Sequence, residues 1–255
     1  MHNTILRALF LVACLVGASW RLYDAFGVHG TLHLDGNPLS TQEERSAKRE
    51  VTDMLSHLDP GNPSAPLNAK PNTQFGMRFK EHINDIARVQ RKFQADTADI
   101  DFVPILSGET FANAEKRSDA RKQIRKLRIA QTNYDKELGD ALDRFLHFML
   151  DASGGKVPPN YTWLRQSNAE LGNLSFKAAE TIDAYLNYKR DTHVSYDPKL
   201  KAVIWPDQES VDGWQQARNK AIEALQRYVK KAEDMETERQ KIFKNGMTEL
   251  QRATP

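Results

Sequence analysis

Two segments of this chain, 109–152 and 208–251, carry apolar side chains at alternating spacings of three and four residues. This periodicity places one apolar stripe along an α-helix, and a repeat near 3.5 residues favours helices that pack nearly side by side. At 1.5 Å per residue, a helix of about forty residues spans about 60 Å, which is too long for a compact globule. Helices of this length are typical of antiparallel bundles, in which each helix lines its neighbours.

Two shorter segments, 75–100 and 160–190, show the same periodicity and predict two more helices. Hydrophobic residues make up 40% of the 255-residue chain, which is enough to build a proper core. The sequence therefore predicts a mainly all-α protein whose residues 75–255 form an elongated antiparallel four-helix bundle.

A short non-helical insert separates the last two predicted helices. Residues 192–206 consist of two apolar, β-branched and aromatic runs around an Asp-Pro-Lys turn, which predicts a β-hairpin. Asp207 is expected to cap the final helix. Because two strands alone are only marginally stable, we expect Tyr196 and Trp205 either to pack on the helices or to form an exposed aromatic anchor for a partner.

Residues 19–74 differ in pattern from the rest of the chain. Residues 28–35 alternate between apolar and polar side chains, which predicts a short strand that ends in a turn. Overlapping capping-box patterns at 40–44 predict the start of a first helix. The proline-rich stretch 59–73 ends that helix and is expected to be a linker.

The N-terminus predicts export. Residues 8–18 form an uncharged apolar run directly after Arg7, and its length matches the core of a signal peptide better than a membrane-spanning helix. Three alternatives follow: cleavage after Ala18, an uncleaved anchor, or acylation of Cys14, because residues 11–14 resemble a bacterial lipobox. In each case the protein is expected in the periplasm or cell envelope. Since Cys14 is the only cysteine, no intramolecular disulfide can form.

The hairpin insert also carries a resemblance. It contains Thr-His-Val-Ser-Tyr at 192–196 and Val-Ile-Trp-Pro-Asp at 203–207. Together with an export signal, a helical body and a final helix, this insert resembles one group of helical envelope lipoproteins from Gram-negative bacteria. The positions that carry the likeness are Thr192, Val194, Ser195, Tyr196, Ile204 and Pro206. No activity is assigned to that group, so the resemblance implies an architecture and a compartment without a chemistry.

Patterns that usually carry catalysis are missing from the sequence. A di-iron site in a helical bundle needs Glu-x-x-His, and no histidine here has glutamate three positions before it. The Gly-Gly-Lys sequence at 154–156 lacks the glycine spacing and the hydroxyl residue of a phosphate loop, and it indicates a helix end. His193, Ser195 and Asp197 alternate on one strand, about 7 Å apart, which is too far for a nucleophile–base hydrogen bond. We therefore expect no enzymatic activity and no cofactor.

One weak metal-site pattern stays open. His29, His33 and Asp35 share a face of the predicted strand, and two imidazoles with a carboxylate can hold Zn²⁺. The alternative is a polar outer face that follows the signal. The isolated histidines, expected at the surface or in partly buried packing positions, are His57, His82 and His147.

Clustered basic residues give the best functional lead. Four arginines between Glu115 and Arg128 recur at helical spacing and form a ridge: Arg117, Arg121, Arg125 and Arg128. Outside the cytoplasm, such a ridge suits anionic lipid, phosphorylated saccharide or an acidic protein surface. The alternative is intramolecular pairing with the acidic stretch 233–238. A net charge of +2 and the export signal argue against a nucleic-acid partner.

We therefore expect a non-enzymatic periplasmic or envelope protein that binds another protein, with the arginine ridge, Tyr196 and Trp205 as candidate contacts. A specific form is an immunity protein that neutralises an incoming antibacterial toxin, because such a protein needs only a signal and a complementary surface. One alternative is an envelope structural or lipid-binding lipoprotein that associates with the membrane through its N-terminus. The other is a metal-dependent enzyme built on the His29, His33 and Asp35 cluster.

Overall fold

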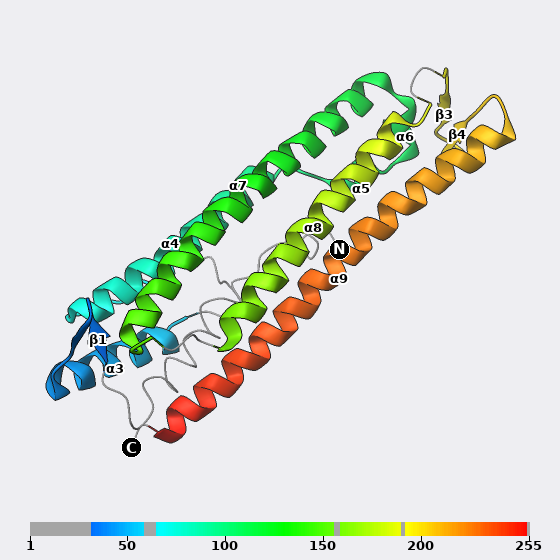
Figure 1. Ribbon diagram of the computed structural model, residues 1–255. Coiled ribbons are helices and arrows are strands. Elements are labelled where there is room, and N and C mark those ends of the chain that lie inside the picture. The colour runs from blue at the N-terminus through cyan, green and yellow to red at the C-terminus, as the bar shows by residue number, and fades with distance from the viewer. Residues whose placement is uncertain (1–31, 59–64, 156–158, 190–191, 254–255) are drawn as a thin grey trace. The chain divides into compact units, whose positions relative to one another are not determined.

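The computed structural model describes residues 32–58, 65–155, 159–189 and 192–253 (Figure 1). In these residues the chain forms seven helices and two antiparallel pairs of short strands, which confirms the prediction of a mainly helical protein. The four long helices are α4 (Gln74–Thr97), α7 (Ala114–Ala152), α8 (Pro159–Asn187) and α9 (Gln208–Ala253).

The predictions for the N-terminus lie outside the part of the chain that the structure describes. They concern the export signal 1–18, Cys14 and His29. Within the described ranges, none of the helices is both long enough and apolar enough to cross a membrane.

The ends of the helices follow local sequence signals. The first described helix, α3 (Thr41–Ser56), begins with a capping box: the Ser40 hydroxyl accepts a hydrogen bond from the Glu43 N–H, and the Glu43 carboxylate accepts one from the Ser40 N–H. At the start of α9, the Asp207 carboxylate accepts a hydrogen bond from the Ser210 N–H at 2.7 Å, as predicted. Helix α8 begins at Pro159, a residue that fits the first helical position because its missing N–H would have no partner there.

The first half of the predicted strand 28–35 lies before residue 32, outside the residues that the structure describes. The described half contains β1 (His33–Leu34), which pairs with β2 (Asn37–Pro38) across a two-residue turn. Both turn residues have positive φ, +54° at Asp35 and +76° at Gly36, as a tight hairpin of this type requires.

Two short helices stand where the sequence predicts a break and the start of a long helix. They are α5 (Phe102–Ile105) and α6 (Gly108–Ala112), and the side chains of Asp101 and Ser107 cap their first turns. Asn113 is extended and separates α6 from α7, so the long helix starts five residues later than predicted. Elements of four or five residues are too short to show helical periodicity in a sequence.

The hairpin predicted at 192–206 is confirmed. It is formed by β3 (Ser195–Asp197) and β4 (Ala202–Ile204), which link α8 to α9 and lie beside α6 (Figure 1). Tyr196 is paired with Val203 in the register. Gly108 of α6 allows this close approach, since a Cβ there would lie 2.9 Å from Val203 Cγ2.

The chain divides into two compact units. Unit 1 contains the described residues of 93–133 and 170–231, and unit 2 contains those of 32–92, 134–169 and 232–253. The core of unit 1 includes an aromatic cluster made of Phe111, Tyr185, Tyr188, Trp205 and Trp214. The core of unit 2 includes four phenylalanines in ring contact, Phe75, Phe79, Phe145 and Phe148.

Candidate functional site

The predicted arginine ridge lies on the half of α7 that belongs to unit 1. Ala120, Ile124 and Leu127 on this helix are buried, with at most 3% of each residue exposed, and they fix the rotation of the helix about its axis. The cationic residues of this stretch are therefore directed to the other sides of α7. We call them the basic face of α7: Lys116, Arg117, Arg121, Lys122, Arg125, Lys126 and Arg128.

Two ridge arginines are engaged inside unit 1. The guanidinium of Arg117 lies 5.4 Å from the centre of the Phe111 ring, in a cation–π contact with the aromatic cluster. Arg121 Nε lies 3.5 Å from the Asp183 carboxylate on α8. Both side chains are half-buried, so we assign them mainly to the packing of unit 1.

The lysines of the basic face have acidic neighbours. Lys116 pairs with Glu109 of α6, Lys122 with Asp119 at 2.8 Å, and Lys126 with Asp99 at 2.7 Å. The hydrogen bond from Lys126 holds the pKa of Asp99 below its usual value. The lysines of the basic face thus form ion pairs within the chain, but with acidic residues other than those of the stretch 233–238. Exposed ion pairs contribute about 0–1 kcal/mol each, so a binding partner can replace them.

The remaining ridge arginines, Arg125 and Arg128, are exposed. Ile129, also on α7, is 57% exposed and follows Arg125 by one helical turn. Exposed apolar and arginine side chains on one helix face are typical of the contacts that dominate protein interfaces. Ile129 was not predicted as a contact residue, although an isoleucine outside the buried stripe of a helix can be recognised in the sequence.

The hairpin places its two aromatic residues differently. Trp205 is 9% exposed and contacts three rings of the aromatic cluster, with centroid distances of 5.5 Å to Phe111, 5.7 Å to Tyr188 and 6.4 Å to Trp214. This environment matches packing rather than an exposed anchor. Tyr196 is half-buried beside Gly108, with 3.6 Å from the tyrosine Cε2 to the position of a Cβ there.

The candidate metal ligands are only partly described. The Asp35 carboxylate accepts two hydrogen bonds from Arg78, at 2.6 and 2.8 Å, and these lower the pKa of Asp35. The bidentate contact uses both oxygens of the carboxylate in an ion pair. In the part of the chain that is described, no group of three histidine, cysteine or acidic side chains is arranged to hold a metal ion.

Comparison with known proteins adds no relative: no family model, curated protein or solved structure matches the chain.

Proposed function

We propose that this chain is a non-enzymatic protein of the cell envelope that binds an acidic surface of another protein through the basic face of α7. The observation that supports this proposal is the placement of exposed Arg125 one turn from exposed Ile129. Arginine supplies a planar donor group for carboxylates, and an apolar side chain beside it gains free energy when water is excluded. This combination favours a protein partner over nucleic acid, for which phosphate contacts would dominate.

The envelope location rests on the N-terminal sequence, in which an apolar run follows Arg7. An immunity protein against a secreted antibacterial toxin is the specific form of the proposal. Such a protein acts by covering its target, so it needs a complementary surface and no catalytic group. Membrane association through the N-terminus is compatible with this role, since it would keep the protein where the toxin arrives.

A photo-crosslinking residue placed at Ile129 tests the proposal. Irradiation of the periplasmic fraction should link one acidic protein to this position, and the purified partner can then be titrated against variants. Arg125→Glu should weaken binding at least tenfold, because it replaces a charge-assisted hydrogen bond with repulsion. Arg227→Glu is the matched control, since Arg227 is also exposed in unit 1 but lies on α9. Equal affinity of both variants, or no protein linked at Ile129, would contradict the proposal.

We also infer that the four long helices associate as an elongated antiparallel bundle. The support is the length of α9, 46 residues, and the buried side chains that recur at three- and four-residue spacing along it. A straight helix of this length spans about 70 Å. Small-angle X-ray scattering should give a radius of gyration clearly above about 18 Å, the value for a compact chain of 255 residues. A value near 18 Å would contradict the elongated bundle.

A further inference from the structure

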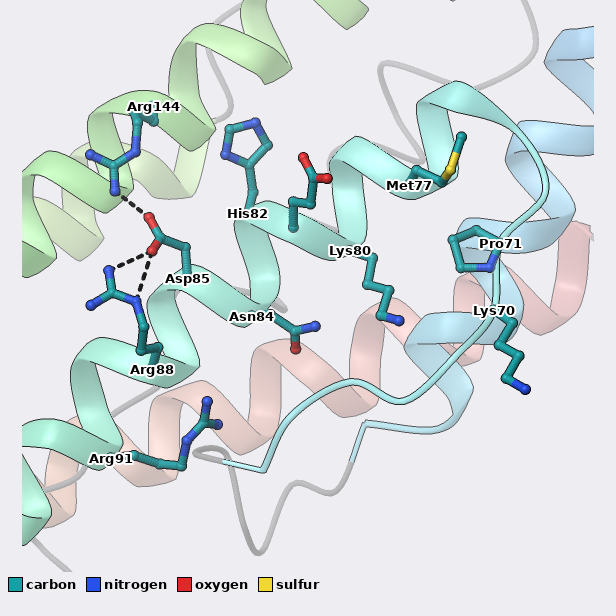
Figure 2. Close-up of a pocket in the computed structure, with 11 residues that line it drawn as sticks. Lys70, Pro71, Met77, Lys80, His82, Asn84, Asp85, Arg88, Arg91 and Arg144 are labelled. Carbon is teal, nitrogen blue, oxygen red and sulfur yellow. Dashed lines mark hydrogen bonds and ion pairs between the residues drawn. The ribbon is translucent and has the colours of Figure 1, made fainter.

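Unit 2 contains a cavity of about 880 Å³ that is widely open to solvent and is distinct from the basic face of α7. Its walls come from α4, from Arg144 on α7 and from the loop 65–73 before α4 (Figure 2). Pockets for small molecules in proteins usually measure about 300–1,000 Å³. The cavity is therefore large enough for a small organic ligand.

The loop wall is held at both ends by side chains of neighbouring helices. The Asn84 amide accepts a hydrogen bond from the Leu67 N–H at 2.7 Å and donates one to the Leu67 carbonyl at 3.3 Å. The Glu50 carboxylate accepts hydrogen bonds from the N–H groups of Asn72, at 2.8 Å, and Thr73, at 3.1 Å. Lys70 and Pro71 lie between these two attachments, so the backbone that carries them is held at the cavity.

Basic side chains face this loop from α4. Lys80 precedes Asn84 by four residues and Arg91 follows it by seven, and all three lie on the side of α4 toward the loop that carries Lys70 (Figure 2). In the described part of the chain, neither Lys70 nor Lys80 has an acidic side chain within ion-pair distance. The loop and the helix thus present two ammonium groups that a ligand can bind.

On the α7 side of the cavity the charged side chains are paired with one another. The Asp85 carboxylate is held by two guanidinium groups, that of Arg88 at 2.6 Å and that of Arg144. Desolvation alone would raise the pKa of Asp85, but the bonds and charges of these arginines outweigh it and lower the pKa. Arg88 also lies 3.9 Å from the Glu137 carboxylate, so the positive charge that this cavity offers a ligand comes mainly from Lys70 and Lys80.

We propose that this cavity binds a phosphomonoester carried on a small molecule or on a lipid headgroup. A phosphomonoester has a charge of about −1.5 to −2 at pH 7 and three acceptor oxygens, which matches the two ammonium groups, Lys80 on α4 and Lys70 on the loop. Met77 and Pro71 add an apolar lining for the rest of the molecule. A carboxylate ligand has a single charge and would balance only one of the two ammonium groups.

Isothermal titration of the full-length protein with glycerol 3-phosphate tests the soluble form of this ligand, with glycerol as the uncharged control. Co-sedimentation with phosphatidylcholine vesicles, with and without phosphatidic acid, tests the lipid form. Binding of the soluble ester alone identifies a free solute, and binding of phosphatidic acid vesicles alone identifies a headgroup. Either result supports the proposal if Lys80→Met and Lys70→Ala weaken binding.

Two variants remove one ammonium group each. Lys80→Met keeps the apolar stem of this half-buried side chain, and Lys70→Ala changes an exposed loop residue. Each should raise the dissociation constant about tenfold, because each removes a charge-assisted contact. Lys136→Met is the matched control, since Lys136 is exposed in unit 2 but does not line the cavity, and it should change the constant less than twofold.

The proposal is overturned if neither phosphomonoester binds, or if Lys80→Met and Lys70→Ala bind it as tightly as Lys136→Met does. Because Lys70 lies on an exposed part of the loop, its variant keeps the test valid even if Lys80→Met unfolds. The outcome is independent of the protein partner proposed for α7, since Arg125→Glu should leave phosphomonoester binding unchanged.

Discussion

Replacing Trp205 tests how the hairpin is held in unit 1. The indole is 9% exposed and contacts Phe111, Tyr188 and Trp214. Truncation of a buried aromatic residue to alanine usually costs about 3–5 kcal/mol, through lost burial and the cavity left behind. Trp205→Ala should therefore lower the free energy of unfolding by about 3 kcal/mol, at the lower end of this range.

The indole nitrogen of Trp205 explains the lower value. In the described residues, no acceptor lies within hydrogen-bond distance of this buried Nε1. A buried donor without a partner costs about 1–3 kcal/mol, and both Trp205→Ala and Trp205→Phe remove that cost. Phenylalanine also keeps most of the ring contacts, so Trp205→Phe should stay within about 1.5 kcal/mol of the wild-type protein.

Urea unfolding followed by circular dichroism measures both variants. With a slope of about 3 kcal/mol per molar urea, a loss of about 3 kcal/mol moves the midpoint by about 1 M. An unchanged midpoint for Trp205→Ala would show that the indole does not support the fold. If Trp205→Phe lost as much as Trp205→Ala, the N–H would be making a hydrogen bond, and the account of the orphaned donor would be wrong.

Four further predictions concern separate parts of the chain. Burial raises the pKa of Tyr185 to about 12, so the folded state keeps its proton longer than the unfolded state does. Below pH 10 the tyrosine is protonated in both states, so it does not make the free energy of unfolding depend on pH. As the pH rises from 10 to 12, Tyr185 should lower the free energy of unfolding by about 2–3 kcal/mol. The urea midpoint of Tyr185→Phe should not show this decrease. Gly76→Ala would place a Cβ against the Glu50 carboxylate and 2.8 Å from Pro71 Cβ, and should destabilise the protein by about 1–3 kcal/mol. In a thermal melt, Gly139→Ala is the control and should not destabilise it, because nothing lies within 4 Å of the added Cβ. A fusion of the N-terminal signal segment to alkaline phosphatase should be active, because the enzyme needs an oxidising compartment, and inactivity would contradict export. Cys14→Ser then separates signal cleavage, which leaves the location unchanged, from acylation, which would lose membrane attachment.

Local signals in the sequence were enough to predict where several of the helices begin or end, but not which residues make contact between helices. Ser40 with Glu43, and Asp207 before α9, satisfy the first N–H groups of their helices through neighbours in sequence, so short motifs reveal them. The two positive-φ glycines after α7, Gly154 and Gly155, also act locally. Helices α5 and α6 were missed because each is too short to complete the periodic pattern on which the prediction depends.

The candidate sites show why tertiary placement escaped the sequence. The ridge was visible as a pattern, but the partners of Arg121 and Lys126 are separated from them by 62 and 27 residues. The cavity of unit 2 could not be foreseen, because Lys70 lies in a stretch whose prolines indicated a linker. Hydrogen bonds that Asn84 and Glu50 accept from its backbone, together with the buried side chain of Leu67, hold this stretch in place before α4.

The contact between Glu50 and Thr73 has a consequence for how this chain can vary in length. It ties two positions that are 23 residues apart, directly at the entry to α4. Doubling the length of a flexible closed loop costs only about 0.6 kcal/mol, whereas hydrogen bonds to a charged group contribute about 1.5–3 kcal/mol each. Insertions between the tied positions should therefore leave the start of α4 in place. In related chains of different length, we expect the residues at positions 50, 73 and 76 to covary.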